Sequence, residues 1–194
     1  TGSVGKTTTT TLTSLFLKEA GRKVYVGGNI GTPLLDKVEQ IGKDDYVVLE
    51  LSSFQLMTMD EKIDRAAITN ISPNHLDYHR SYEEYIFAKT NIFNGQDENG
   101  ILVLNQDNEL TKEFAKKAKG KVRMFSIEEK VDCGVYYENG EIISTVNGKK
   151  EKILDAKDVK LVGMHNIANN CTASSLVIDI TGKDAIKKIA MSFG

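Results

Sequence analysis

Short, nearly uninterrupted apolar runs recur along this chain and alternate with helical stretches. The apolar runs are KVYVGG from residue 23, YVVLEL at 46–51, AAITNI at 66–71 and ILVLN at 101–105. Runs of this kind are typical of parallel strands that are covered on both faces. Helical patterns occupy 33–40, 82–94 and 107–119, and a further helix is expected from Thr7 to Ala20. The order predicts βαβ units, and therefore an α/β fold with a doubly wound, mostly parallel sheet.

The pattern changes near the C-terminal third of the chain. Two Asn-Gly pairs, at 139–140 and 147–148, separate alternating segments. Asn-Gly between such segments is a strong hairpin signal, so we expect a small antiparallel hairpin region near 131–162. A helix from about 166 to 180 and another from 183 should close the chain. No linker divides the 194 residues, which indicates one domain.

Composition excludes several classes of function. The net charge of −2 gives no electrostatic basis for a nucleic-acid partner or an anionic membrane surface. No apolar run reaches the roughly 20 residues of a membrane span, and nothing resembles a signal peptide. Cys133 and Cys171 match no metal-binding spacing and fit a reducing compartment. We therefore expect a cytoplasmic protein without membrane insertion. We also expect a monomer.

The chain opens with TGSVGKTTTT, which has the form of a phosphate-binding loop. Gly2 and Gly5 would let the backbone curl so that its N–H groups face an anion. Lys6 would reach the β- and γ-phosphates, and the Thr7 hydroxyl would hold Mg²⁺ at the positive end of the following helix. The motif lacks the first glycine of the full Gly-x-x-x-x-Gly-Lys-Thr pattern. A glycine turn that happens to precede Lys-Thr is the alternative.

Two charged residues interrupt apolar patterns. Glu50 lies near the C-terminal end of the run 46–51, where a carboxylate is costly unless it is paired or binds metal. Alternatively, it hydrogen-bonds a neighbouring helix end. Lys89 falls in the middle of the apolar stripe of the helix 82–94, a helix that should begin with a capping box of Ser81 and Glu84. Either its ammonium reaches the edge of the stripe, or it is a desolvated amine with a lowered pKa that can react with CO₂ to form a carbamate.

Further candidates follow the strands. His75 comes after the run 66–71, at the edge of the sheet where α/β folds bind ligands, and is either structural or a metal ligand. Asn166 and Asn169 are spaced to share one helix face, where they either cap the helix or offer amide edges to a nucleobase.

Together these segments resemble the central domain of the Mur ligases. The motifs that carry the resemblance are TGSVGKTT, GGNIGTPL, ELSSFQL, NISPNHLDYH, YIFAKTNIF and GMHNIANN, in that order, and they cover essentially all 194 residues. GGNIGTPL and ELSSFQL resemble the members that add D-glutamate to UDP-N-acetylmuramoyl-L-alanine. One departure is Val4, since loops of this family usually carry asparagine at that position. Backbone contacts survive this change, but an asparagine side-chain contact does not.

The resemblance implies a set of roles. ATP phosphates would lie against Lys6 and the amides of Gly2, Ser3, Val4, Gly5, Lys6, Thr7 and Thr8. Thr7 and Glu50 would share one Mg²⁺, and His75 with a CO₂-derived carbamate on Lys89 would hold a second. Asn29, Ser52 and Gln55 resemble contacts to the UDP-sugar, and Asn166 and Asn169 resemble contacts to adenine.

The resemblance also implies an ATP-dependent, amide-forming ligase of bacterial peptidoglycan precursor synthesis. Complete ligases of the family carry an N-terminal and a C-terminal domain besides the central one, so we expect 1–194 to be a central ATP-binding domain. By itself it should be inactive. The alternatives are another P-loop ATPase or kinase that shares only the fold, and a nucleotide-binding module without ligase turnover.

Overall fold

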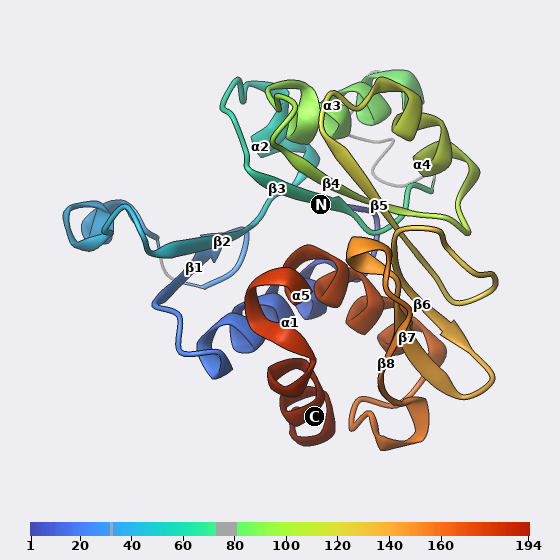
Figure 1. Cartoon of the computed structure of the whole chain (residues 1–194). Helices are drawn as coiled ribbons and strands as arrows, with labels where there is room; N and C mark the ends of the chain where they lie inside the picture. Colours follow the sequence, from blue (N-terminus) through green and yellow to red (C-terminus); the bar gives the residue numbers. More distant parts are fainter. Residues whose placement is uncertain (32, 73–80) are drawn as a thin grey trace.

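Two sheets with helices packed against them form the described part of the chain, residues 1–31, 33–72 and 81–194, in a computed structural model (Figure 1). The helices are α1 (Lys6–Glu19), α2 (Ser53–Met57), α3 (Tyr82–Asn94), α4 (Glu109–Phe114) and α5 (Met164–Ser192), with short 3₁₀ helices η1 (Leu35–Gln40), η2 (Ala115–Lys117), η3 (Val146–Gly148) and η4 (Ala156–Asp158). The strands are β1 (Val24–Gly28), β2 (Tyr46–Glu50), β3 (Arg65–Ile68), β4 (Ile101–Asn105), β5 (Lys121–Ser126), β6 (Gly134–Glu138), β7 (Glu141–Ser144) and β8 (Glu151–Asp155).

The larger sheet has six strands in the order β3-β4-β5-β6-β7-β8. Its first four strands pair in parallel, and β6, β7 and β8 pair antiparallel as the Asn-Gly signals predict. Asn139 and Gly140 both adopt positive φ, the conformation that a tight hairpin turn requires. The hairpins therefore extend the parallel sheet at one edge.

The smaller sheet is the parallel pair β1–β2, which stands apart from the larger sheet in Figure 1. Both strands lie where the apolar runs predict. However, β2 is not covered on both faces: Val47 is 43% exposed and Leu49 is 39% exposed. The helix expected at 33–40 is the 3₁₀ helix η1, which buries none of its residues.

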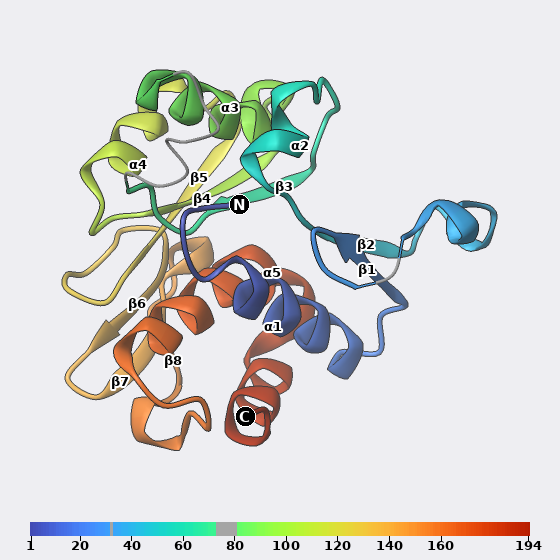
Figure 2. The same ribbon diagram turned by 180° about the vertical axis from the view of Figure 1, so that it is seen from behind.

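Helices cover both faces of the parallel strands of the larger sheet, which confirms the α/β fold class. Leu12 and Phe16 of α1 and Cys171 of α5 share one core with Val103 of β4. The neighbouring residues Leu102 and Leu104 point to the opposite face, where they join a second core with α3 and α4. Figure 2 shows α1 and α5 side by side, in agreement with their close packing.

The C-terminal helix is broken where the sequence predicts. The backbone of Gly182 leaves helical geometry, with φ 69° and ψ 170°, and divides α5 into two segments. In the described part of the chain, no helix combines the length and the apolar character that crossing a membrane requires.

Candidate functional site

The glycine–lysine loop lies between the end of β3 and the first turn of α1. Gly5 is the N-cap of α1 with φ 83°, and no described side chain caps that helix end. The first N–H groups of α1 are therefore available to an anion. A Cβ atom at Gly5 would collide with Asn169, and one at Gly2 would collide with Thr69. Both positions thus require glycine for the close approach of the loop to its neighbours.

Two polar residues at the end of β3 hold the loop. The Asn70 side-chain oxygen accepts hydrogen bonds from the N–H groups of Ser3 (3.2 Å) and Val4 (3.1 Å). The hydroxyl of Thr69 donates to the Val4 carbonyl at 2.6 Å. The Val4 side chain itself is 64% exposed, so its contacts with the loop anchors are made by backbone atoms alone. Thr69 and Asn70 are not among the site residues predicted from the sequence, although both are polar residues that end an apolar strand.

Lys6 contacts the loop itself, and Ser3 contacts helix α3. The Lys6 ammonium donates to the Ser3 carbonyl at 3.4 Å, so it is folded over the loop. The Ser3 hydroxyl lies 2.8 Å from the hydroxyl of Tyr85, a fully buried residue of α3. Tyr85 therefore connects the loop to α3, a role that an aromatic residue in an apolar helix stripe does not reveal from the sequence.

Glu50 is a buried carboxylate that faces the start of α1. It is 2% exposed and accepts hydrogen bonds from the Thr7 hydroxyl at 2.8 Å and from the Asn29 amide at 3.2 Å. Both donors are neutral, and no ion pair to Glu50 exists among the residues that the structure describes. A buried carboxylate with an adjacent hydroxyl and no cationic partner suits a hard divalent cation.

The β1–β2 pairing brings Asn29 to this carboxylate. Gly28 pairs with Glu50 in parallel register, and the Asn29 N–H donates to the Glu50 carbonyl at 2.7 Å. Thr7, Asn29 and Glu50 thus meet at the C-terminal edge of β2, as the sequence analysis expected of Thr7 and Glu50.

Lys89 is buried, at 2% exposure, so its ammonium does not reach solvent at the edge of the stripe. Its Nζ donates to the Gly2 carbonyl at 3.0 Å and to the Thr1 hydroxyl at 3.3 Å. It also lies 4.8 Å from the centre of the Tyr85 ring. Burial, and next the positive charge of Lys6, lower the pKa of Lys89 to about 8. A substantial neutral fraction therefore exists just above neutral pH, as a reaction with CO₂ requires.

A smaller cavity of about 280 Å³ lies beside the loop. Its lining includes Val4, Gly5, Asn105, His165 and Asn169. Asn169 donates to the Asn166 side chain at 3.2 Å and accepts from Thr9 at 3.4 Å. The structure thus puts Asn169 in the cavity wall, with Asn166 behind it as a hydrogen-bond partner.

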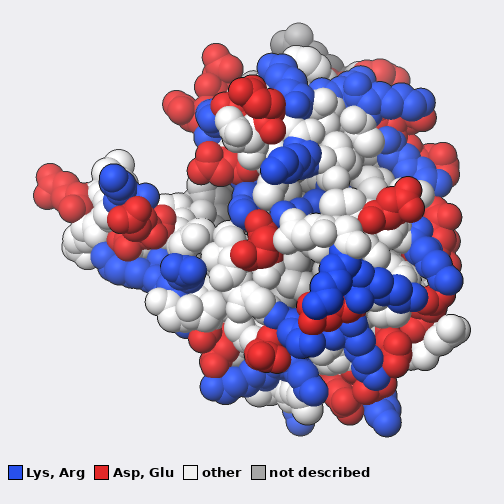
Figure 3. Space-filling model, viewed as in Figure 1, with Lys and Arg blue, Asp and Glu red and all other residues white. Residues whose placement is uncertain are grey.

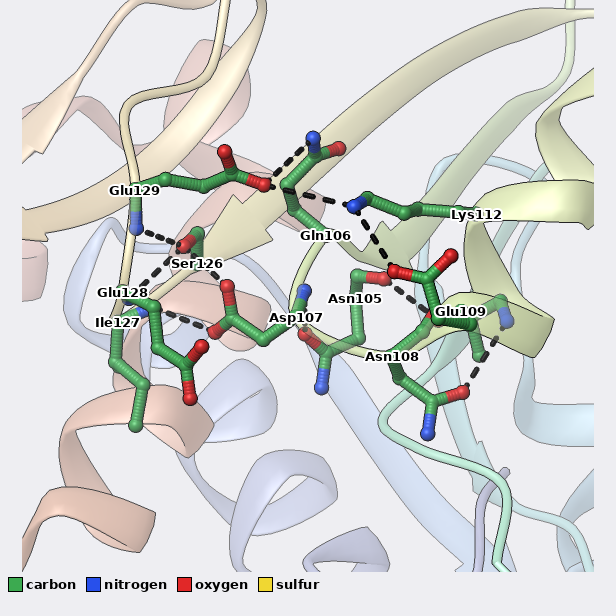
Figure 4. Close-up of polar contacts among 11 residues, drawn as sticks. Asn105, Gln106, Asp107, Asn108, Glu109, Lys112, Ser126, Ile127, Glu128 and Glu129 are labelled. Carbon is green, nitrogen blue, oxygen red and sulfur yellow. Dashed lines mark hydrogen bonds and ion pairs between the residues drawn. The ribbon is translucent and has the colours of Figure 1, made fainter.

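Asn105, which lines this cavity, belongs to a network of polar contacts (Figure 4). The Asn105 amide donates to the Thr69 carbonyl at 2.9 Å, and its oxygen accepts from the Asp107 N–H at 2.8 Å. Asp107 accepts in turn from the Ser126 hydroxyl and the Ile127 N–H. The network fixes the C-terminal ends of β4 and β5 relative to the loop anchor Thr69.

The structure gives less direct evidence on the remaining predicted site residues, which are Ser52, Gln55 and His75. Ser52 and Gln55 form a capping box at the start of α2, in which the Ser52 N–H donates to the Gln55 side chain at 2.9 Å. They lie two and five residues beyond Glu50. His75 lies outside the described residues. Among the residues that are described, no cluster of three or more His, Cys, Asp or Glu could hold a metal.

Comparison with known proteins agrees with this geometry. Residues 1–177 match the family model described as Mur ligase middle domain. The chain is 50% identical over 193 residues to a UDP-N-acetylmuramoylalanine--D-glutamate ligase of Clostridium tetani (strain Massachusetts / E88), covering 100% of the chain and 41% of that relative. It is 49% identical over 194 residues to the ligase of the same name from Clostridium perfringens (strain 13 / Type A), with 42% of that relative covered.

Solved structures show the same fold. The chain superposes with a TM-score of 0.75 and 20% identity on a UDP-N-acetylmuramoyl-L-alanyl-D-glutamate--2,6-diaminopimelate ligase, covering 100% of the chain and 45% of that structure. MurF from Acinetobacter baumannii gives a TM-score of 0.72 and 19% identity, with 98% of the chain and 44% of that structure covered.

The chain thus spans less than half the length of these relatives. The family match covers most of the chain and includes the glycine–lysine loop, Glu50, Lys89, and Asn166 and Asn169 of α5. A P-loop ATPase related only by fold would not share half of its residues over the whole chain. This chain belongs to the Mur ligase middle-domain family.

Proposed function

We propose that this chain is the central ATP-binding domain of a ligase that joins D-glutamate to UDP-N-acetylmuramoyl-L-alanine in bacterial peptidoglycan precursor synthesis. The observation that carries the proposal is the loop at the uncapped N-terminus of α1, with Lys6, Thr7 and the buried Glu50 around it. The identity of 50% to ligases with this name supports the choice of substrate. We place the reaction in the cytoplasm and expect a monomer.

In the proposed reaction, a carboxylate oxygen of UDP-N-acetylmuramoyl-L-alanine attacks the γ-phosphorus of ATP, and ADP leaves. The product is an acyl phosphate. The neutral amine of D-glutamate then attacks the acyl carbon, and the tetrahedral intermediate loses phosphate and a proton to give the amide. The loop amides and Lys6 bind the phosphate oxygens and offset the charge that develops on them.

Mg²⁺ would be held by Thr7 and Glu50, and would supply further charge neutralisation at the phosphates. The existing Thr7–Glu50 hydrogen bond shows that both side chains reach the same point beside the helix end. In this proposal Asn29, Ser52 and Gln55 contact the UDP-sugar, and Asn166 and Asn169 contact adenine. The cavity beside Asn169 supports the assignment of the base.

For Lys89 we propose a carbamate that, with His75, binds a second Mg²⁺. The Lys89 ammonium first loses one proton to solvent. The neutral Nζ then attacks the carbon of CO₂ and a second N–H proton leaves to solvent, so that a cation becomes an anion. Burial of Lys89 beside the loop and its lowered pKa support this proposal. Full-length enzyme in ¹³C-bicarbonate with Mg²⁺ should show a carbamate resonance that is absent from Lys89→Arg and retained in Lys18→Arg. A resonance retained in Lys89→Arg would assign the carbamate elsewhere.

Calorimetry with Mg²⁺-ATP tests the nucleotide site. Lys6→Ala removes a charged donor to the phosphates and should weaken binding roughly 10- to 100-fold, because such hydrogen bonds contribute about 1.5–3 kcal/mol. Lys18→Ala is the matched control, since Lys18 is an exposed lysine in the last turn of the same helix. Equal ATP affinity of Lys6→Ala and Lys18→Ala would contradict the loop assignment.

Measurement of phosphate release separates a ligase from a nucleotide-binding module. The full-length enzyme should release phosphate only when both UDP-N-acetylmuramoyl-L-alanine and D-glutamate are present. The isolated chain should bind ATP without turnover. Phosphate release by the full-length enzyme at the same rate with and without the UDP-sugar would contradict the ligase assignment.

A further inference from the structure

The peptide group between Val4 and Gly5 is held by two side chains from the end of β3. The Val4 carbonyl accepts a hydrogen bond from the Thr69 hydroxyl at 2.6 Å and one from the Asn70 side-chain amide at 3.3 Å. The peptide bond is trans, and in a planar trans peptide group the C=O and the N–H point in opposite directions. The Gly5 N–H therefore points away from Thr69 and Asn70.

The Gly5 N–H differs from the two N–H groups that precede it. Those of Ser3 and Val4 both donate to the side-chain oxygen of Asn70, at 3.2 and 3.1 Å. Within residues 1–31, 33–72 and 81–194, no group accepts the N–H of Gly5. Gly5 is also the N-cap of α1, whose end has no side-chain cap. Its N–H thus joins the first N–H groups of α1 as a donor that a ligand can use.

The contacts of Thr69 fix the direction of its hydroxyl. Thr69 is 5% exposed, and its carbonyl accepts from the Asn105 amide at 2.9 Å. Asn105 is held in turn by the Thr111 hydroxyl, which donates to the Asn105 carbonyl at 2.6 Å. The Thr69 hydroxyl also lies 3.4 Å from the Thr1 carbonyl, so the Val4 carbonyl is its nearer acceptor. The hydroxyl is therefore set against the Val4 carbonyl from the far side of the loop.

We propose that Thr69 is a positioning residue of the nucleotide site: its hydroxyl holds the Val4 carbonyl and so directs the Gly5 N–H at a phosphate oxygen of the bound nucleotide. The inference rests on the proposed function, because it requires a phosphate at the N-terminus of α1. A rotation of this peptide group would break the hydrogen bonds from Thr69 and Asn70. The donor is therefore directed before the ligand arrives, and such preorganisation strengthens binding.

Calorimetry with Mg²⁺-ATP on the full-length enzyme tests the role of the hydroxyl. Thr69→Val removes the hydroxyl with little change of shape and should weaken ATP binding about tenfold, because a hydrogen bond to a charged group is lost or misdirected. Thr69→Ser keeps the hydroxyl and should restore most of the affinity. Thr145→Val is the matched control, since it removes a hydroxyl that donates to the Val131 carbonyl at 3.0 Å in the hairpin region. Its ATP affinity should equal that of wild type.

NMR of the Gly5 amide separates positioning from a purely structural role. Labelling with ¹³C-carbonyl valine and ¹⁵N-glycine selects glycines that follow valine, which in this chain are Gly5, Gly27 and Gly163. Saturating Mg²⁺-ATP should move the Gly5 proton resonance downfield in wild type and in Thr69→Ser, since its N–H gains a phosphate acceptor. In Thr69→Val the resonance should move much less at the same saturation. Gly27 of β1 is the internal control and should not move.

The outcomes separate this inference from the proposed function. Either an unchanged ATP affinity or an unchanged Gly5 shift in Thr69→Val would overturn the inference and leave the proposed function in place. In wild type alone, a Gly5 resonance that stays in place at saturating Mg²⁺-ATP would overturn it without any variant. Absence of ATP binding by the wild-type enzyme would overturn the proposed function together with the inference.

Discussion

The environment of Lys89 disfavours the charged form of its side chain. It is buried at 2% exposure, it lies near Lys6, and its hydrogen-bond acceptors are a backbone carbonyl and a hydroxyl rather than a carboxylate. The folded protein therefore holds this amine with a pKa of about 8, against 10.5 for an ordinary lysine. The burial that supports the proposed reaction of Lys89 with CO₂ also reduces the stability of the fold at neutral pH.

This difference predicts a pH dependence of stability. Between pH 8 and 10.5 the unfolded chain binds a proton at Lys89 that the folded chain does not, so the free energy of unfolding should rise with pH in this window. The rise due to Lys89 should be at most about 3 kcal/mol. Urea unfolding of wild type and Lys89→Met from pH 7 to 10.5 measures it, since the variant lacks the titrating group. If the free energy of unfolding changed with pH by the same amount in both proteins, the lowered pKa of Lys89 would be contradicted.

At the scale of elements, a partly buried ion cluster fixes α5 against the parallel strands. Asp179 of α5 accepts hydrogen bonds from Arg65 of β3 at 2.7 Å and from Arg123 of β5 at 2.9 Å. Burial raises the pKa of Asp179, but the hydrogen bonds from Arg65 and Arg123 outweigh this effect and hold it well below the usual range. The cluster keeps α5 in place on the sheet that carries the loop anchors.

Removal of the Asp179 charge should therefore be strongly destabilising. Asp179→Asn leaves the Arg123 side chain, which is 6% exposed, without its counter-charge, and should lower the free energy of unfolding by about 3–5 kcal/mol. Asp184→Asn, on an exposed position of the same helix, is the control and should change it by less than about 0.5 kcal/mol. Chemical denaturation at pH 7 measures both variants. Similar losses in the two would contradict a structural role for the cluster.

The pH dependence of this contribution has the same sign as that of Lys89, because both folded-state pKa values are lowered, but it lies in the acidic range. The folded-state pKa of Asp179 is depressed, so its contribution is fully present above the ordinary aspartate value of 3.8. It is lost as the pH falls through the lower folded-state pKa.

At the scale of the whole molecule, charge is distributed without a dominant sign. The net charge is −2, and Figure 3 shows acidic and basic side chains interspersed over the visible face. Attraction of a nucleotide therefore depends on the local groups of the loop rather than on a long-range field. The residues that would bind it come from α1, β2, β3 and α5, so binding should stabilise the fold as a unit.

Thermal unfolding with and without ligand measures this coupling. At a Mg²⁺-ATP concentration of 100 times Kd, the native state should gain about 2.7 kcal/mol. For a chain of this size that corresponds to a rise in Tm of roughly 5–10 °C. Lys6→Ala should lose most of the rise at the same ligand concentration, whereas Lys18→Ala should keep it. An unchanged Tm for wild type under these conditions would contradict nucleotide binding by the isolated chain.

The sequence by itself determined the features that depend on local backbone preference and on periodicity. The apolar runs placed β1, β2, β3 and β4, and Ser81 caps α3 as the motif predicts. The Asn-Gly pairs placed the hairpins because few other residues adopt positive φ at low cost. Glycine and lysine at fixed spacing identified the loop, because all the residues of this motif lie within a few consecutive positions of the sequence.

Tertiary structure decided the features that depend on contacts between distant segments. Strand β5 carries Lys121 and Arg123, so no apolar run marks it, and its pairing between β4 and β6 makes it a strand. The segment 33–40 forms only a 3₁₀ helix, because no core lies against it. Lys89 is buried because the glycine–lysine loop packs over it and the Gly2 carbonyl accepts a hydrogen bond from its Nζ, and the sequence of the helix alone does not show this contact. The anchors Thr69 and Asn70 gained their roles from residues more than 60 positions away, a distance over which local patterns carry no information.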